Sequence, residues 1–348
     1  MLVGCKDGAL LSFKILEKEG NSDITSLDAE NEFSKKPVTQ LNVIEEQNLL
    51  VSCSGGYINV HNIGYNNYSD TVQIAPRTQI SKSKGCIFYS LDQIGKNYFL
   101  SVILKKRLII FQLLEKEFVF QKEMVLPDTP NTITLTGESI CVGYKKGYSL
   151  LNLSTSHDQF LFPLEKGTPI ISKLPNRQLL LSKDTSSIVI GFDGKPTKKF
   201  TISWTESPLD FKYCFPYLIG LMSKVIEVRT FVSNSNTIQF IPIKALFISC
   251  KGDSIYLANQ SSIFKLSQIP LLSQISQLVE EKLFEDALNL LSLLPPSLID
   301  PQQKQTKISL IQTQHAYSLF SKGNFFLFIF LILLLIFLIK LYLMKLSF

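Results

Sequence analysis

A short hairpin-like pattern recurs through most of this chain. In its clearest form, residues 139–153, an apolar run and a small residue are followed by a turn of Lys and Gly and a second apolar run. This is the pattern of two antiparallel strands joined by a tight turn. Taking the first apolar residue of each copy as its anchor gives Leu2, Leu50, Leu100, Ile140, Leu180, Leu218 and Ile255. The steps between anchors are 48, 50, 40, 40, 38 and 37 residues.

Seven hairpins at a period near 40 residues are typical of a radial repeat, because a four-stranded propeller blade needs about 40–45 residues. One blade cannot bury both of its faces, so neighbouring blades pack around a central channel. A sandwich of similar hairpins also gives short strands and frequent turns. The propeller is favoured because the regular spacing runs through about 270 residues, whereas a sandwich seldom exceeds about 250. We therefore predict a mainly β chain with a seven-bladed β-propeller over residues 1–270.

The first and widest parts of this repeat depart from the ideal pattern. The first hairpin begins at residue 2, which leaves no room for the strand that should open its blade. We expect the first blade to be incomplete because the sequence lacks its original N-terminus. The two longest anchor steps contain the polar stretches 17–32 and 64–84, which we predict to be surface loops inserted between strands.

After Pro270 the apolar period changes from two to 3.6 residues, which predicts amphipathic helices. Leu271, Ile275, Leu278 and Val279 mark the first helix, and Phe284, Ala287, Leu288 and Leu291 mark the second, which Pro295 and Pro296 end. Ile308, Ile311, His315 and Leu319 mark a third. Successive short helices are typical of an α-solenoid, so residues 271–324 are predicted to be the start of one.

The last segment, residues 325–348, is different in kind. It is almost entirely Phe, Leu and Ile as far as Met344, and twenty such residues form a helix of about 30 Å, enough to span a bilayer. It also contains almost only residues with A/T-rich codons, as translated non-coding sequence would. We predict a hydrophobic C-terminal helix that is either a transmembrane helix or a segment foreign to the native protein.

Composition limits the classes of protein further. The chain has 348 residues, a net charge of +6 and no long basic block, which gives little support to nucleic-acid binding. The six cysteines lie far apart without a Cys-x-x-Cys pair, which indicates buried thiols in a reducing compartment. The N-terminus is too soon charged for a secretory signal. We therefore expect the propeller to be cytosolic.

No catalytic, metal or cofactor constellation is recognisable. His61 alternates within a strand, His157 stands in a loop beside Asp158, and His315 lies on a helical face, so all three are interpreted as structural. Trp204 is interpreted as a core residue, and the pair Glu280–Glu281 as a solvated helix face. Residues 194–197 resemble half of a phosphate-binding loop, but Val189 stands where the first glycine is needed. Gly55 and Gly56 form a hairpin turn. The chain is therefore predicted not to be an enzyme.

Several stretches resemble a known family. Residues 34–44, 128–131, 139–144, 216–217 and 226–230, together with the passage from Ile269–Pro270 into residues 278–288, are similar to the citron homology (CNH) domain and early helices of the vacuolar protein sorting 39 (Vam6-like) family. The resemblance spans roughly residues 2–324. It implies a β-propeller followed by a longer solenoid, in a subunit of the HOPS tethering complex that binds a late-endosomal Rab GTPase and promotes fusion with the vacuole or lysosome.

The resemblance implies partners rather than a reaction. They are other tethering-complex subunits and a Rab GTPase on the cytoplasmic face of late endosomes, lysosomes or vacuoles, with no nucleic acid and no cofactor. Residues 17–32 and 64–84 are the loops expected to take part in docking. The alternatives are the related early-endosomal subunit of the TGF-β receptor-associated type, a CNH-type module that binds small GTPases, and a tail-anchored membrane receptor.

Overall fold

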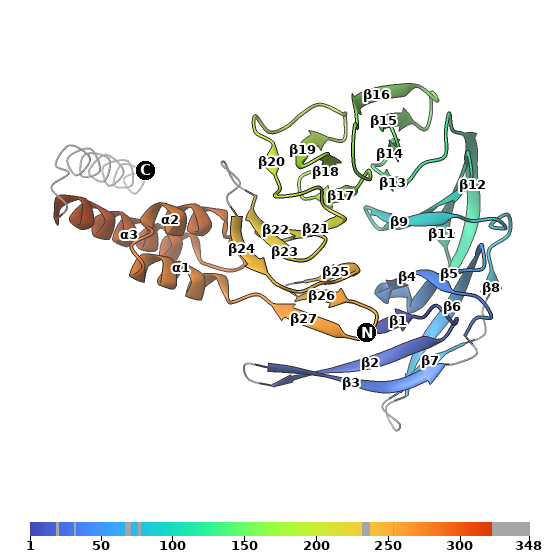
Figure 1. Cartoon of the computed structure of the whole chain (residues 1–348), viewed down its shortest axis with the longest axis horizontal. Helices are drawn as coiled ribbons and strands as arrows, with labels where there is room; N and C mark the ends of the chain where they lie inside the picture. The colour runs from blue at the N-terminus through green and yellow to red at the C-terminus, as the bar shows by residue number, and fades with distance from the viewer. Residues whose placement is uncertain are drawn as a thin grey trace, which may run out of the picture. The chain divides into compact units, whose positions relative to one another are not determined.

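The computed structural model describes residues 1–18, 21–30, 33–66, 71–75, 78–231, 237–252 and 254–321. These residues form a mainly β chain with a β-propeller and three α-helices (Figure 1). The predicted hydrophobic segment 325–348 lies outside the described residues. Within the described ranges, no helix is both long enough and apolar enough to cross a membrane.

The described strands pair in seven antiparallel sheets, most of which follow the chain as simple meanders. The first three sheets comprise β1 (Leu2–Gly4), β2 (Leu10–Lys18) and β3 (Asn21–Glu30); β4 (Val38–Ile44), β5 (Leu49–Ser54), β6 (Tyr57–Asn66), β7 (Thr71–Ile74) and β8 (Thr78–Gln79); and β9 (Phe88–Ile94), β10 (Asn97–Leu104), β11 (Arg107–Leu114) and β12 (Glu117–Val125). A short 3₁₀ turn, Glu45–Gln47, links β4 to β5.

The remaining four sheets complete the β part of the chain. They comprise β13 (Thr132–Leu135), β14 (Ser139–Tyr144), β15 (Gly147–Asn152) and β16 (Asp158–Pro163); β17 (Ile171–Leu174), β18 (Gln178–Lys183), β19 (Ser186–Gly191) and β20 (Ile202–Ser203); β21 (Asp210–Cys214), β22 (Tyr217–Leu221), β23 (Ile226–Thr230) and β24 (Thr237–Ile241); and β25 (Phe247–Lys251), β26 (Ser254–Ala258) and β27 (Ile263–Ser267).

The six sheets from β4 to β27 are the blades of the propeller, since each begins with the strand that precedes the recurrent hairpin. The sheet β1–β3 begins directly with that hairpin and therefore lacks the innermost strand of a blade. It occupies the place of the predicted incomplete first blade. The predicted total of seven blades is not confirmed, because a sheet without an innermost strand does not line a propeller axis.

The chain divides into two compact units. The first unit contains Met1–Phe211 and Gly220–Val225, and the second contains Lys212–Ile219 and Ile226–Phe348. In the first unit the innermost strands β4, β9, β13 and β17 contact one another in chain order. Neighbouring sheets therefore stack face to face within this unit, as the period near 40 residues predicts.

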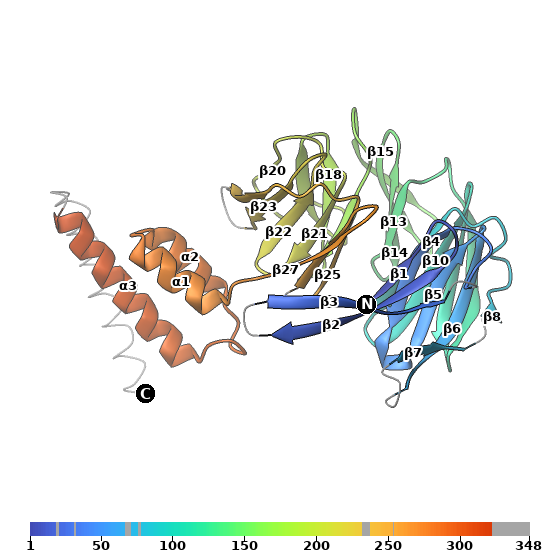
Figure 2. The same cartoon turned by 60° about the horizontal axis from the view of Figure 1, so that its bottom comes forward.

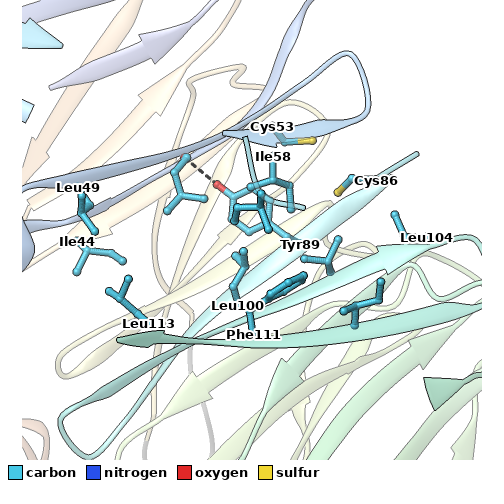
Figure 3. Packing of buried hydrophobic residues seen from close by; sticks show 14 residues of the cluster. Ile44, Leu49, Cys53, Ile58, Cys86, Tyr89, Leu100, Leu104, Phe111 and Leu113 are labelled. Atoms are coloured by element: carbon cyan, nitrogen blue, oxygen red, sulfur yellow. Dashed lines mark hydrogen bonds between the residues drawn. The ribbon is translucent and has the colours of Figure 1, made fainter. Parts of the chain in front are cut away.

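The largest apolar cluster of the first unit lies between the sheets β4–β8 and β9–β12 (Figure 3). Strands β10 and β11 are apolar almost without alternation, because both of their faces are covered by neighbouring sheets. Phe111, Leu100 and Val102 are fully buried there. The hydroxyl of Tyr89 crosses the cluster and donates to the carbonyl of Val51 at 3.0 Å (Figure 3).

The outermost strand carries a β-bulge in four of the described sheets. The pairing shifts by one residue between Ser12 and Phe13 in β2–β3, and at the corresponding place in β11–β12, β15–β16 and β23–β24. The extra residue in these four pairs belongs to the outer strand: Leu27, Gln121, Leu161 or Ile238. A bulge of this kind leaves one residue unpaired and increases the local twist.

The predictions that residues 17–32 and 64–84 are loops are wrong for much of their length. Residues 21–30 form β3, which pairs with β2 in a long hairpin (Figure 2). Within the second stretch, β6 continues to Asn66, and β7 and β8 both pair with it. Pairing with an adjacent strand satisfies the backbone of these polar segments, so context overrides their composition.

The helices of the second unit are α1 (Leu271–Glu280), α2 (Phe284–Leu293) and α3 (Pro301–Ser321), and their existence and periods are confirmed. Ile275, Phe284, Leu291 and Ile311 belong to one small apolar cluster that draws on all three helices. Asp300 caps α3, since its Oδ1 accepts the backbone N–H of Gln302 at 2.9 Å. Glu280 and Glu281 are exposed, as predicted.

Candidate interaction surface

The three histidines do not converge. His61 on β6 is buried, its Nε2 lies 3.0 Å from Ser52 Oγ, and its ring contacts that of Phe33. His157 is exposed in the turn before β16. His315 on α3 stacks on Phe284 with ring centroids 5.2 Å apart. Each histidine therefore has the structural setting predicted from its pattern.

Trp204 is a core residue of the first unit, as predicted. It is 5% exposed, its indole N–H donates to Ser187 Oγ at 2.8 Å, and its ring stacks on Phe211. The glycine-containing stretches are turns. Gly55 and Gly56 adopt φ values of 58° and 75° between β5 and β6, and Gly194 donates its N–H to Gly191 O in a turn after β19. No helix follows either turn, so neither can cradle a phosphate as a P-loop does.

The sequence pattern gave no indication of a buried polar network around Asp92 on β9. Its carboxylate accepts hydrogen bonds from Ser90 Oγ at 2.7 Å, Thr134 Oγ1 at 2.9 Å and the backbone N–H of Leu135 at 3.0 Å. Lys173 Nζ on β17 lies 2.6 Å from Asp92 Oδ1. Asp92 is 5% exposed, and these four groups together satisfy a charge that burial would otherwise disfavour. The network joins the innermost strands of three successive sheets.

Other polar side chains link sheets in the same way. Gln40 on β4 accepts from Tyr89 N at 2.8 Å and donates to Tyr89 O at 3.0 Å. The buried hydroxyl of Tyr148 lies 2.7 Å from Ser182 Oγ and accepts from Ile170 N at 2.9 Å. The signal that could have revealed these links is a polar residue inside an apolar strand, but one sequence alone does not show its partner. These links fix the sheets of the first unit to one another.

Two buried thiols also face each other. Cys53 at the end of β5 and Cys86 before β9 belong to the apolar cluster of Figure 3. A hydrogen bond from the Cys86 thiol lowers the pKa of Cys53 to about 7, and the same contact raises the pKa of Cys86. Burial raises the pKa of Cys141 on β14 to about 12. All six cysteines are thiols, and four of them are buried, as predicted.

Two open clefts lie in the described part of the first unit. A mostly apolar cleft of about 710 Å³ lies between β1–β2 and β6–β7 and is lined by Leu2, Leu10, Ile63, Val72 and Ile74 among others. A more polar cleft of about 450 Å³ lies between the sheets β13–β16 and β17–β20, and its lining includes Glu138, His157, Arg177 and Asp193. Arg177 and Asp193 are both exposed. The clefts are suited to side chains of a partner protein.

Groups of acids, imidazoles or thiols that could hold a metal ion are absent from the described ranges. The buried titratable groups there are paired within strands, and the exposed ones are dispersed over turns. This arrangement presents several surfaces on a rigid support, and none of them assembles the nucleophile, base and oxyanion donors that catalysis requires.

Comparison with known proteins places these features in a family. Residues 1–252 match the family model of the CNH domain. The Vam6/Vps39-like protein of Homo sapiens is 28% identical over 347 residues, covering 93% of this chain and 38% of that protein. Vacuolar sorting protein 39 of Arabidopsis thaliana is 29% identical over 336 residues, covering 93% and 32%. This chain thus spans between about a third and two-fifths of the length of these relatives.

A more distant relative and one solved structure complete the comparison. Transforming growth factor-beta receptor-associated protein 1 of Mus musculus is 23% identical over 304 residues, covering 83% of this chain and 34% of that protein. The solved AfRom2 CNH domain has a TM-score of 0.51 at 18% identity and covers 77% of this chain and 94% of that domain. At this level of identity the match supports the fold alone.

Proposed function

This chain belongs to the CNH domain family and is similar to its Vam6/Vps39-like members along 93% of its length, and from that premise we propose that it is a non-catalytic subunit of a HOPS-type tethering complex. Its role is in the fusion of endosomes with lysosomes or vacuoles and in vesicle-mediated protein transport. The resemblance predicted from residues 34–44, 128–131 and 139–144 is thereby confirmed at the level of the family.

One observation carries the proposal: the similarity to vacuolar sorting proteins runs through the propeller and continues into the helices. A CNH module that follows a catalytic region would not need α1, α2 and α3 directly after its last strand. We assign residues 1–270 to the propeller and residues 271–324 to the start of a solenoid. The propeller would have a docking role, with a seventh, incomplete blade formed by β1–β3.

The partners in this proposal are other tethering-complex subunits and a Rab-type GTPase on the cytoplasmic face of late endosomes, lysosomes or vacuoles. The two clefts of the first unit and the hairpin β2–β3 are the surfaces available for them. The dispersed titratable groups support the non-catalytic part of the proposal, since reaction chemistry needs such groups to converge.

The proposal is tested by binding of the purified chain to a late-endosomal Rab GTPase loaded with a GTP analogue or with GDP. We expect retention of the GTP-analogue form only, because Rab effectors distinguish the two switch conformations. Co-purification with the other tethering subunits is the second measurement. Absence of both interactions would contradict the proposed function.

An early-endosomal Rab, loaded in the same two ways, is the matched control. Preferential binding of this control would favour the subunit of the TGF-β receptor-associated type over the Vps39 type. The similarity to both kinds of relative makes this the informative contrast. Equal retention of GTP and GDP forms would indicate contact without effector recognition.

A further inference from the structure

The hairpin tips and the connections between sheets in the first unit gather on one face. Ser34 N donates to Gly8 O at 3.0 Å, and Gly85 N donates to Gly56 O at 2.8 Å. Each of these hydrogen bonds joins the tip of one hairpin to the segment that leads into the next sheet. The same arrangement continues in the next sheet, where Leu126 N donates to Lys106 O at 2.7 Å.

The series continues without interruption through the following sheets. Leu164 N donates to Lys146 O at 3.0 Å, and Lys166 N donates to Asp184 Oδ1 at 2.6 Å. Further on, Trp204 N donates to Thr185 O at 2.8 Å, and Ser223 N donates to Glu206 Oε1 at 2.7 Å. Tips and connections therefore alternate along one end of the sheets.

We call this surface the tip face. Its hairpin tips are residues 5–9, 54–57, 104–107, 144–147, 183–186 and 221–225, and its connections are residues 33–37, 80–87, 126–131, 164–170 and 204–209. All of these residues belong to the first unit. The face is therefore defined within one compact body.

The tip face is strongly basic. It carries thirteen basic side chains, namely Lys6, Lys35, Lys36, Lys82, Lys84, Lys105, Lys106, Arg107, Lys145, Lys146, Lys166, Lys183 and Lys224. Twelve of them are exposed, and Lys183 is half-buried. Five acidic side chains lie on the same face, which gives it a net charge of +8, while the whole chain carries +6. The charges of the chain are therefore polarised toward this face.

The acidic side chains of the tip face are mostly occupied by local structure. Asp7 accepts the N–H of Ala9, Asp184 accepts that of Lys166, and Glu206 accepts both the N–H and the hydroxyl of Ser223. Among the described residues, ion pairs engage two of the thirteen basic groups, Lys106 with Asp128 and Arg107 with Glu123. The positive field of the face is therefore only slightly compensated from within.

The opposite ends of the same sheets provide an internal reference. Their described turns are residues 45–48, 95–96, 115–116, 136–138, 153–157, 175–177 and 192–201, with six basic and five acidic side chains. Their net charge is +1. The basic character is thus a property of one end of the sheets and not of turns in general.

Apolar side chains protrude beside the lysines. Val125, the last residue of β12 before the connection 126–131, is 79% exposed, and Leu209 is 53% exposed. Ile87 is exposed to a similar degree at the end of the connection 80–87. Basic groups with scattered apolar side chains are the combination that attracts a protein to an anionic bilayer and anchors it there.

We infer that the tip face docks onto the surface of a membrane rich in anionic lipids. The charges are carried by twelve lysines and a single arginine, spread over separate tips, so they act as mobile point charges and not as bidentate forks. A fluid layer of phosphate headgroups adapts to such dispersed charges, whereas a folded acidic protein needs a compact centre of aromatic and arginine anchors. This inference goes beyond the proposed function, because lipid binding needs neither a Rab GTPase nor another subunit.

The test is co-sedimentation of the 348-residue chain with phosphatidylcholine vesicles, with and without phosphatidylserine. We expect affinity to rise with phosphatidylserine and to fall with salt, since surface charges are screened beyond about 10 Å at 0.1 M salt. Replacing both Lys145 and Lys146 by Gln is expected to lower the phosphatidylserine-dependent affinity by about tenfold or more. Binding to phosphatidylcholine alone measures any contribution of apolar segments and is subtracted.

The matched control replaces Lys96 and Lys195, two exposed lysines at the opposite ends of the sheets, by Gln. It removes the same charge, so an effect within about twofold is expected if the tip face docks. Equal losses for both variants, or no dependence on phosphatidylserine, would overturn the inference. A loss of Rab or subunit binding without any loss of vesicle binding would also overturn it and assign the face to an acidic protein. Thermal unfolding of both variants verifies that they are folded.

Discussion

The strand core of the first unit and the helical core of the second are built differently. Between the sheets β4–β8 and β9–β12, fourteen buried residues form one cluster in which both faces of β10 and β11 are covered. The three helices share eight buried residues, and α3 buries three of its twenty-one residues while Leu310 and Tyr317 remain exposed.

The difference follows from how each repeat meets its neighbours. A sheet in the middle of the series has a neighbour on each side, so its apolar side chains are buried whichever way they point. An amphipathic helix buries one stripe and needs another helix to cover a second. We therefore expect the strand core to hold most of the folding free energy, and Trp204, the single tryptophan, reports on that unit.

The largest effect is expected when the strand core is opened. Replacing Phe111 by Ala removes a fully buried ring and should lower the free energy of unfolding by about 4 kcal/mol. Urea denaturation followed by Trp204 fluorescence measures it. A loss below about 1 kcal/mol would mean that the two sheets are not tightly packed.

The polar links of the strand unit can be broken separately. Replacing Asp92 by Ala leaves two hydroxyls and the N–H of Leu135 without their acceptor, so a loss of about 3 kcal/mol is expected. Replacing Lys173 by Ala should cost less, because its side chain is a third exposed. The same fluorescence transition compares the two variants, and an inverted order would contradict the network.

The helical core is tested by replacing Leu291, a fully buried residue of α2, by Ala. We expect a loss of about 2 kcal/mol, confined to the helices because their cluster is small. Circular dichroism should show earlier loss of helix while the Trp204 transition stays in place. A matching shift of both transitions would show that the units unfold together.

A pH dependence distinguishes the buried thiol of the strand core. The pKa of Cys141 is about 12 in the folded chain against 9.0 for a model thiol. Below pH 9 its contribution to stability is fully present, and between pH 9 and 12 it is lost by about 1.4 kcal/mol per unit, since only the unfolded state ionises. Replacing Cys141 by Ala should make the fall in stability above pH 9 less steep. Identical slopes in both proteins would refute this.

The smallest effect concerns a single hydroxyl. Replacing Tyr148 by Phe keeps the buried ring and removes the contacts to Ser182 and Ile170, which should cost about 1 kcal/mol. Replacing the exposed Tyr317 of α3 by Phe is the control and should change stability little. Equal effects of the two substitutions would show that the link between β15 and β18 adds no stability.

The hairpins themselves could be predicted because their signal is local. The pairs Lys105–Lys106 and Lys145–Lys146 stand between apolar runs, and a tight turn there is dictated by neighbours in sequence. Strands β3 and β7 were missed because their polar residues gain a partner only after β2 and β6 have formed. Long-range pairing of this kind leaves little trace in composition.

The surfaces were harder to foresee than the fold. The sequence shows no basic block, yet hairpin tips about 40 residues apart bring thirteen basic side chains onto one face. Asp92 and Lys173 are likewise separated by 81 residues but lie in contact. A period fixes which residues are equivalent in successive sheets, but it does not show what charge their sum will carry.

The bulges of the outer strands bear on how this molecule stays apart from its own copies. An outermost strand such as β12 offers unpaired amide and carbonyl groups to any passing chain. The unpaired Gln121 at its middle bends that row of groups, so a second molecule finds no straight ladder to extend. Because the same irregularity recurs in four sheets, the protein is protected all along its flanks from stacking into fibres, however crowded the membrane on which it gathers.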